Sequence, residues 1–281
     1  MDNNLAFPLR LNTISRLVRE HSAPLVLLSC GVGRQWTWIG RKMIEPAINR
    51  AAAISVRDLD SMSVLREMFP SVSGKLFVAP DPGLWAAETY NIRPESKTGM
   101  RIGLGITAPS VLRRRSIDAA EQYSLAYWAA LADRLNTIGY DVTLFCNGAP
   151  KDYEASRAVH MRSPSTTLAK RPTSGKNLAQ LINTFDLIVS HRLHANIVAT
   201  SLDVKALGLG WDDKVRSYFN LINQPDAMFT AAPTISQMTR TIEELLGRST
   251  VDRIHLENLK SQTLDFLLNS LSLHSPTKLQ R

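Results

Sequence analysis

Short apolar runs alternate with amphipathic segments along most of this chain. Runs rich in aliphatic and β-branched residues predict buried strands at 24–30, 53–58, 75–79, 101–106, 141–146, 185–189 and 204–209. Helical spacing predicts helices at 10–20, 40–50, 60–69, 117–138, 176–184, 195–202, 213–222, 234–247 and 251–271. Such strand–helix alternation is typical of α/β proteins with parallel sheets.

The stretch 91–100 separates two of these α/β blocks. It is rich in turn-forming residues and poor in apolar ones, as linkers are. We therefore expect two Rossmann-like domains with a cleft between them. The N-terminal domain covers 1–95, and a C-terminal, donor-binding domain covers 96–281 and ends in a helical tail. The first predicted helix should bury the face formed by Leu11, Ile14, Leu17 and Val18.

The turn between a predicted strand and helix at 190–197 concentrates basic side chains. Ser190 is placed to cap the helix, and His191, Arg192 and His194 follow it. Anions bind beyond the carboxyl ends of strands and at helix N-termini, where amides are free. We expect a phosphate or carboxylate site here. A core histidine beside a solvated one is the alternative. Two imidazoles lack the third protein ligand that a zinc site needs.

Further charged candidates follow other predicted strands. Arg57 and Asp58 close one strand, either as an ion pair that caps the next helix or as an anion clamp held by its carboxylate. Asp81 lies in a Pro-Asp-Pro turn. Lys214 follows the last clear strand and is either a solvated surface residue or a charge directed into the same cleft as His194.

The composition is that of an ordinary globular protein and does not identify the binding partner. Hydrophobic residues make up 44% and charged residues 21%, and the net charge of +8 suits an anionic substrate, a membrane face or nucleic acid. Cys30 and Cys146 look like reduced core thiols. The apolar runs are too short for a membrane span, and the first residues do not form a signal peptide, so we expect a cytoplasmic location. Arg113–Arg115 lacks an aromatic ladder, which argues against nucleic acid.

Three motifs in this order resemble the polysaccharide pyruvyl transferase family. They are Ser55-Val56-Arg57-Asp58 with Ser61, then Val78-Ala79-Pro80-Asp81-Pro82, then Ser190-His191-Arg192-Leu193-His194-Ala195 with Trp211-Asp212-Asp213-Lys214. The resemblance implies a GT-B-like fold and transfer of pyruvate from phosphoenolpyruvate, as a ketal, to a sugar of an exopolysaccharide or cell-wall glycan. The family's glycine-rich opening turn is not found ahead of these motifs, which predicts a shortened first domain.

The resemblance also implies roles for individual residues. His194 would act as the acid/base or phosphate-contacting group, and Arg57 would approach from the facing domain. Substrate would be bound by Arg192, Leu193, His191, Lys214, Asp58 and Asp81. No cofactor or metal is expected. The glycan acceptor is compatible with lipid linkage and with peripheral association at the inner face of a membrane. The alternatives are a GT-B glycosyltransferase using a nucleotide sugar and a non-catalytic member that only binds the anionic donor.

Overall fold

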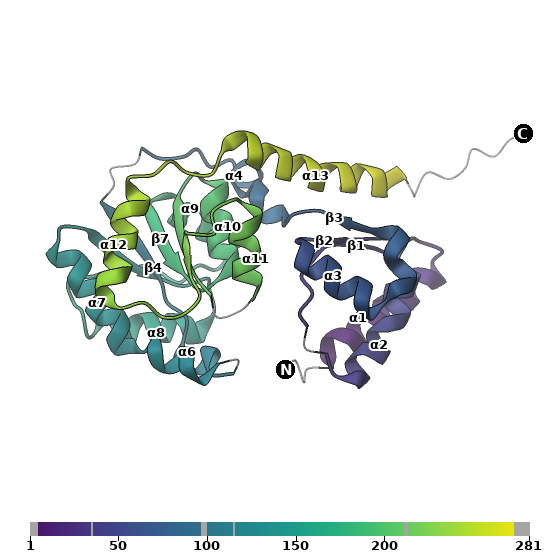
Figure 1. Cartoon of the computed structure of the whole chain (residues 1–281), viewed down its shortest axis with the longest axis horizontal. Helices are drawn as coiled ribbons and strands as arrows, with labels where there is room; N and C mark the ends of the chain where they lie inside the picture. The colour runs from purple at the N-terminus through teal and green to yellow at the C-terminus, as the bar shows by residue number, and fades with distance from the viewer. Residues whose placement is uncertain (1–4, 35, 97–99, 115, 211–212, 273–281) are drawn as a thin grey trace, which may run out of the picture. The chain divides into compact units, whose positions relative to one another are not determined.

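The computed structural model describes residues 5–34, 36–96, 100–114, 116–210 and 213–272 (Figure 1). The chain forms two compact units, each built on a parallel sheet. Unit 1 comprises Met1–Pro82 and Leu256–Arg281, and unit 2 comprises Gly83–His255. The expected α/β class with parallel sheets is therefore confirmed. None of the described helices is long and apolar enough to cross a membrane.

Unit 1 has a three-stranded sheet in the order β1-β2-β3. Its strands are β1 (Val26–Cys30), β2 (Ala53–Val56) and β3 (Leu76–Val78). Its helices are α1 (Ala6–Glu20), α2 (Trp38–Arg50), α3 (Leu59–Met68), the 3₁₀ helix η1 (Pro70–Lys75) and most of α13 (Arg253–Ser272). Alternate residues of β2 serve separate cores. Ile54 packs in the main core with α2 and α3, whereas Ala53 packs with Phe266 of α13.

Helix α1 buries a different face from the one predicted. Leu11 packs on the core of unit 1, but Ile14 is 48% and Leu17 is 51% exposed. Instead, the polar side of α1 faces α2, where Arg50 Nη1 donates hydrogen bonds to Ser15 Oγ at 3.0 Å and to the side chain of Asn12 at 3.3 Å. Polar contacts therefore orient this helix, and the apolar spacing alone misplaced its buried side.

Unit 2 has a six-stranded parallel sheet in the order β6-β5-β4-β7-β8-β9. Its strands are β4 (Arg101–Gly105), β5 (Asp141–Phe145), β6 (Thr167–Leu168), β7 (Leu187–Ser190), β8 (Lys205–Leu209) and β9 (Met228–Phe229). Its helices include α4 (Ala86–Tyr90), α5 (Pro109–Leu112), α6 (Ile117–Gln122), α7 (Leu125–Thr137), α8 (Pro150–His160), α9 (Gly175–Asn183), α10 (Leu193–Ser201), α11 (Asp213–Leu221) and α12 (Ile235–Leu246). The 3₁₀ helix η2 (Pro82–Trp85) begins where unit 1 ends. The strand order reverses between β4 and β7, which are hydrogen-bonded neighbours.

The helix predicted over 117–138 is two helices, α6 and α7. Ser116 caps α6 by accepting the N–H of Ala119, and Ser124 caps α7 by accepting the N–H of Tyr127. Between them Tyr123 leaves the helical conformation and is only 3% exposed. Two capping serines and a buried aromatic residue therefore break a segment whose apolar spacing is continuous.

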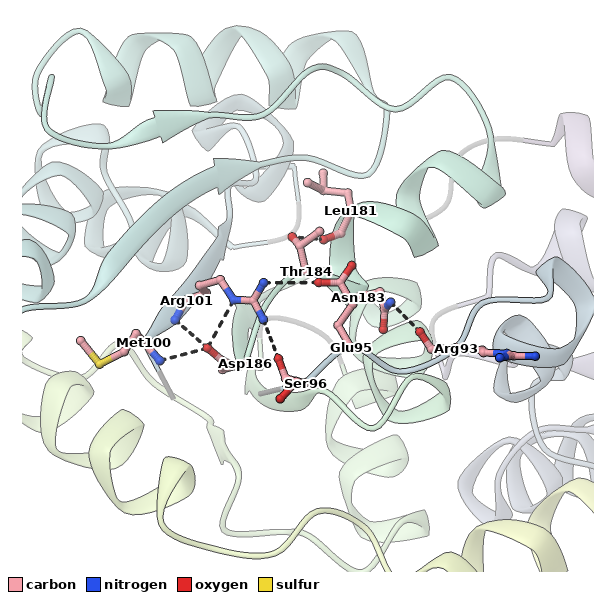
Figure 2. Close-up of polar contacts among 9 residues, drawn as sticks. All are labelled: Arg93, Glu95, Ser96, Met100, Arg101, Leu181, Asn183, Thr184 and Asp186. Carbon is pink, nitrogen blue, oxygen red and sulfur yellow. Dashed lines mark hydrogen bonds and ion pairs between the residues drawn. The ribbon is translucent and has the colours of Figure 1, made fainter. Parts of the chain in front are cut away.

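The boundary between the units lies at residues 82 and 83, not at 95 and 96 as the turn-rich stretch predicted. Figure 2 shows why the preceding segment belongs to unit 2. Arg101 Nη1 contacts Glu95 at 3.3 Å, and its Nη2 donates to the carbonyl of Ser96 at 2.9 Å. Asn183 donates to the carbonyl of Arg93. Buried Asp186 accepts the backbone N–H of Arg101 at 2.7 Å. These bonds fasten a polar stretch to the sheet.

Candidate functional site

Arg192 lies where the strand order of the unit 2 sheet reverses. It follows β7 by two residues and is the N-cap residue of α10. Because β7 pairs with β4, Arg192 lies beside the loop that follows β4. Open α/β sheets bind their ligands outside the strand ends at such a reversal. The side chain of Arg192 is 27% exposed, so it can reach a ligand from solvent.

A buried carboxylate holds the Arg192 guanidinium. Asp152 Oδ2 accepts hydrogen bonds from Arg192 Nε at 3.0 Å and from Nη2 at 2.5 Å, and its Oδ1 accepts the backbone N–H of Ala108 at 3.0 Å. Asp152 is fully buried in the first turn of α8. One carboxylate therefore links the loops that follow β4, β5 and β7. Sequence reasoning missed Asp152, although an acidic residue just behind Pro150 after a strand was an available signal.

His191 is a core residue. It is 1% exposed, and its ring centroid lies 4.4 Å from that of Tyr123 and 5.8 Å from that of Trp128, both in edge-on arrangements. Burial, assisted by the charge of Arg192, lowers the pKa of His191 to about 3, so the ring is neutral near pH 7. We therefore remove His191 from the cationic ligands predicted from the sequence.

Ser190 shapes the turn but does not cap the first turn of α10 as predicted. Its Oγ accepts the N–H of Arg192 at 3.0 Å, and Arg192 occupies the N-cap position. Leu193 and His194 are the first two residues of α10. Leu193 is half-buried and His194 is exposed. The helix N-terminus therefore presents His194 rather than His191.

Lys214 is the second residue of α11, as His194 is of α10. The two helices follow the neighbouring parallel strands β7 and β8, so both begin at the same edge of the sheet. They pack together, because the hydroxyl of Tyr218 donates to Thr200 Oγ1 at 2.7 Å. The structure thus gives His194 and half-buried Lys214 equivalent places on adjacent helices. Trp211 and Asp212 lie outside the described residues.

In unit 1, the Arg-Asp-x-x-Ser motif joins β2 to the loop after β1. Arg57 Nε donates to Asp58 Oδ2 at 3.3 Å. Asp58 Oδ1 accepts the N–H of Ser61 at 2.7 Å and so caps α3. Ser61 Oγ in turn accepts the N–H of Val32 at 3.0 Å. The ion-pair-and-cap arrangement, one of the two readings left open from the sequence, is present.

The Arg57 guanidinium packs against the backbone of Gly31. A Cβ at Gly31 would lie 2.6 Å from Arg57 Cζ, so only glycine allows this approach without displacing the side chain. The Arg57 side chain is 13% exposed. Its Nη2 is buried and, among the described residues, has no hydrogen-bond partner. The described part of the chain therefore leaves one buried donor of this guanidinium without an acceptor.

The Pro-Asp-Pro turn is anchored at the same edge of the unit 1 sheet. The carbonyl of Pro80 accepts hydrogen bonds from Ser29 Oγ and from Thr263 Oγ1 of α13, each at 2.9 Å. Ser29 has a left-handed backbone with a φ of 50°, which non-glycine residues adopt rarely and often at functional sites. Half-buried Asp81 follows directly. Segments 29–31, 57–61 and 80–81 thus converge at the carboxyl ends of β1, β2 and β3.

Two other sequence features contribute less. Arg113 and Arg114 are exposed just after α5, and Arg115 falls outside the described residues. Within the described ranges, no three His, Cys, Asp or Glu side chains gather as metal ligands.

A family model described as polysaccharide pyruvyl transferase matches residues 1–213. A search of curated proteins found no match. Among solved structures, the UDP-GlcNAc 2-epimerase of Methanocaldococcus jannaschii is similar with a TM-score of 0.60 and 10% identity, over 93% of this chain and 74% of that one. A glycosyltransferase of Rickettsia africae has a TM-score of 0.57 and 10% identity, over 98% and 84%. The S. aureus MnaA–UDP structure has a TM-score of 0.56 and 11% identity, over 99% and 83%. These likenesses show the GT-B-like fold of such glycosyltransferases and epimerases.

Proposed function

This chain belongs to the polysaccharide pyruvyl transferase family, and we propose that it transfers pyruvate from phosphoenolpyruvate to a sugar as a cyclic ketal. The observation that carries the proposal is the pair of hydrogen bonds by which Asp152 holds Arg192, at the place where the strand order of the sheet reverses. A guanidinium held rigid in this way recognises planar, multiply charged anions better than a free side chain does.

The donor would need several positive or N–H-donating groups, because phosphoenolpyruvate carries both a phosphate and a carboxylate. Arg192, His194 and Lys214 lie at the carboxyl edge of one sheet, and the first two belong to the N-terminus of α10. A helix N-terminus adds free amides and a favourable dipole. We assign these three residues to the donor, with Leu193 packing beside them.

The proposed reaction begins with protonation of the enol carbon, which makes the adjacent carbon oxocarbenium-like. A sugar hydroxyl attacks that carbon, and the bond to the phosphate oxygen then breaks to release phosphate. A second hydroxyl of the sugar attacks the same carbon and closes the ketal. One hydroxyl proton replaces the proton given to the enol carbon, and the other leaves with phosphate. We assign the proton transfers to His194, whose residue type suits general acid–base catalysis.

We assign Arg57 to the reaction as a second guanidinium, with Asp58 as its support and Asp81 near the acceptor. Three features of unit 1 support this assignment: the Arg57–Asp58 pair, the close approach to Gly31 and the buried Nη2 of Arg57. The convergence of Asp81 on the same sheet edge supports a polar acceptor such as a sugar.

The test is to incubate the protein with phosphoenolpyruvate and a panel of glycans and to follow phosphate release. His194→Ala should lower the rate by at least about 10²-fold without lowering the melting temperature, because His194 is exposed. His21→Ala, also at an exposed histidine, is the matched control and should keep full activity. Undiminished pyruvyl transfer by His194→Ala would refute the role of this residue.

A glycosyltransferase that uses a nucleotide sugar is the second candidate, favoured by the fold that this chain shares with a Rickettsia africae glycosyltransferase. Thermal-shift measurements distinguish the two donors, since a ligand raises the stability of the state that it binds. Stabilisation by phosphoenolpyruvate alone supports pyruvyl transfer, and stabilisation by UDP-sugars alone supports the alternative. Binding of phosphoenolpyruvate without turnover on any glycan would indicate a non-catalytic member.

A further inference from the structure

Large apolar side chains gather at one end of unit 1, where α1 and α2 begin. Leu5 precedes α1 and Phe7 lies in its first turn, while Trp38 and Ile39 open α2. Their exposed fractions are 36%, 59%, 73% and 52%. We call these four residues the apolar tip. Exposure of a single apolar residue is ordinary, but a cluster that includes Trp and Phe marks an interaction surface.

The packing of the two helices places their first turns, which carry the apolar tip, near each other. A Cβ at Gly40, in the first turn of α2, would lie 3.8 Å from Leu5 Cδ2. Arg50, at the far end of α2, donates to Asn12 and Ser15 further along α1. The helices therefore run in the same direction with their first turns side by side.

The surroundings of the tip are strongly basic. Near the tip in sequence, positions 5–10 and 34–45 hold four Lys or Arg and one Glu, a net charge of +3. Exposed Arg10 follows the tip on α1, exposed Arg34 precedes α2, and exposed Arg41 and Lys42 follow Ile39. The one acid among these positions, Glu45, is paired with Lys42 at 3.2 Å. Most of the positive charge is therefore not neutralised locally.

We propose that the apolar tip and its arginines bind the surface of an anionic lipid bilayer. Trp and Phe side chains partition into the headgroup boundary, and neighbouring Arg and Lys side chains attract acidic headgroups. Charge complementarity favours this partner over a second copy of the chain, because two such tips would bring like charges together. The proposal rests on the surface of unit 1 alone and is independent of the proposed reaction.

The experiment is cosedimentation of the full chain with vesicles of phosphatidylcholine, with and without phosphatidylglycerol. Binding should require phosphatidylglycerol and weaken as salt is added, because exposed charges are screened. The double variant Phe7→Ser, Trp38→Ser should bind about tenfold more weakly or worse, since both rings lose their burial in the bilayer. Met161→Ser is the matched control, because Met161 is 71% exposed in unit 2, and it should bind as the wild type does.

Two outcomes would overturn the proposal: no binding of the wild type to acidic vesicles, or equal binding by the double variant. A dimer in gel filtration that the double variant dissociates, together with no vesicle binding, would instead identify the tip as a contact between copies. If circular dichroism shows that the double variant does not fold, brominated lipid is used to quench tryptophan fluorescence in the wild type and in Trp38→Phe. The wild type should be quenched more than Trp38→Phe, and equal quenching would contradict the proposal. Phosphate release with a water-soluble glycan and no vesicles should be the same in wild type and double variant, so failure of the membrane proposal leaves the reaction testable.

Discussion

His191 and His194 lie three residues apart, yet one ring is enclosed by aromatic side chains and the other is exposed. The sequence places both at the same strand-to-helix turn, and it predicts their neighbourhood well. Which ring enters the core depends on Tyr123 and Trp128, which come from a crossover some way upstream. Local spacing contains no information about that contact. The sequence alone therefore could not decide which histidine lies in the core and which is free to bind a ligand.

The burial of His191 predicts how stability depends on pH. Because the folded pKa is about 3 and the ordinary value is 6.5, the unfolded chain takes up a proton below pH 6.5 that the folded protein excludes. The neutral His191 ring therefore contributes its full stabilisation of the folded state above pH 6.5, and this contribution is lost as the pH falls toward 3. The free energy of unfolding should be about 2 kcal/mol lower at pH 5 than at pH 7 from this group.

Urea unfolding of wild type and His191→Phe at the two pH values measures this dependence. The variant should show a clearly smaller loss between pH 7 and pH 5, whatever its stability at pH 7. His21→Gln, which changes an exposed histidine, should behave as the wild type does. An equal loss in His191→Phe and the wild type would assign the pH dependence to other groups.

At the level of elements, the sequence predicts the strands better than the helices. The long strands of both sheets appear within a few residues of their predicted positions, because each is an apolar run between turn residues. Strands β6 and β9 have two residues each and leave no periodic signal. Helix predictions failed where side-chain hydrogen bonds outweigh apolar spacing. Ser124 starts a new helix, α7, and the bonds of Arg50 change which face of α1 is buried.

Asp152 joins the loops after three strands, which predicts the effect of removing its charge. Asp152→Asn keeps an acceptor for the N–H of Ala108 but loses the ion pair with Arg192. The guanidinium should then sample several orientations, so KM for phosphoenolpyruvate should rise by about tenfold, with a smaller change in kcat. Steady-state phosphate release measures both constants.

The exposed pair of Arg240 and Glu244 supplies a control for the Asp152 variant. Glu244→Gln removes a comparable charge contact at the surface and should leave KM unchanged, since exposed ion pairs contribute little. A fall in kcat with unchanged KM in Asp152→Asn would show that Asp152 does not act by positioning a donor-binding arginine.

For the whole molecule, the sequence predicts two α/β blocks but not the course of the chain between them. The last helix begins at the end of unit 2 and continues into unit 1, where Phe266 lies 5.6 Å from Phe77 and Thr263 bonds to Pro80. The boundary at residues 82 and 83 falls in the short Pro-Asp-Pro-Gly turn at 80–83. The longer turn-rich stretch at 91–100 is tied to the sheet of unit 2 by Arg101 and Asn183. Long-range bonds of this kind determine domain membership.

The return of α13 predicts that Phe266→Ala destabilises unit 1 selectively. Phe266 is 6% exposed and packs on Ala53 and Ala79, so its truncation should cost about 3 kcal/mol. Hydrogen exchange should accelerate in β1–β3 and remain slow in β4, β5 and β7. Leu271→Ala on the same helix, at a side chain that is 65% exposed, is the control and should change neither. Equal acceleration in both sheets would show that the units unfold as one.

The path of α13 also sets an order of assembly during synthesis. The ribosome makes the strands of unit 1 first, but Thr263 and Phe266, which cover one side of that sheet, emerge only after every strand of unit 2. Because domains fold as units while the chain is made, the block made second can finish first. The sheet that positions Arg57 and Asp81 is therefore covered on one side only after residues 263–266 have been synthesised.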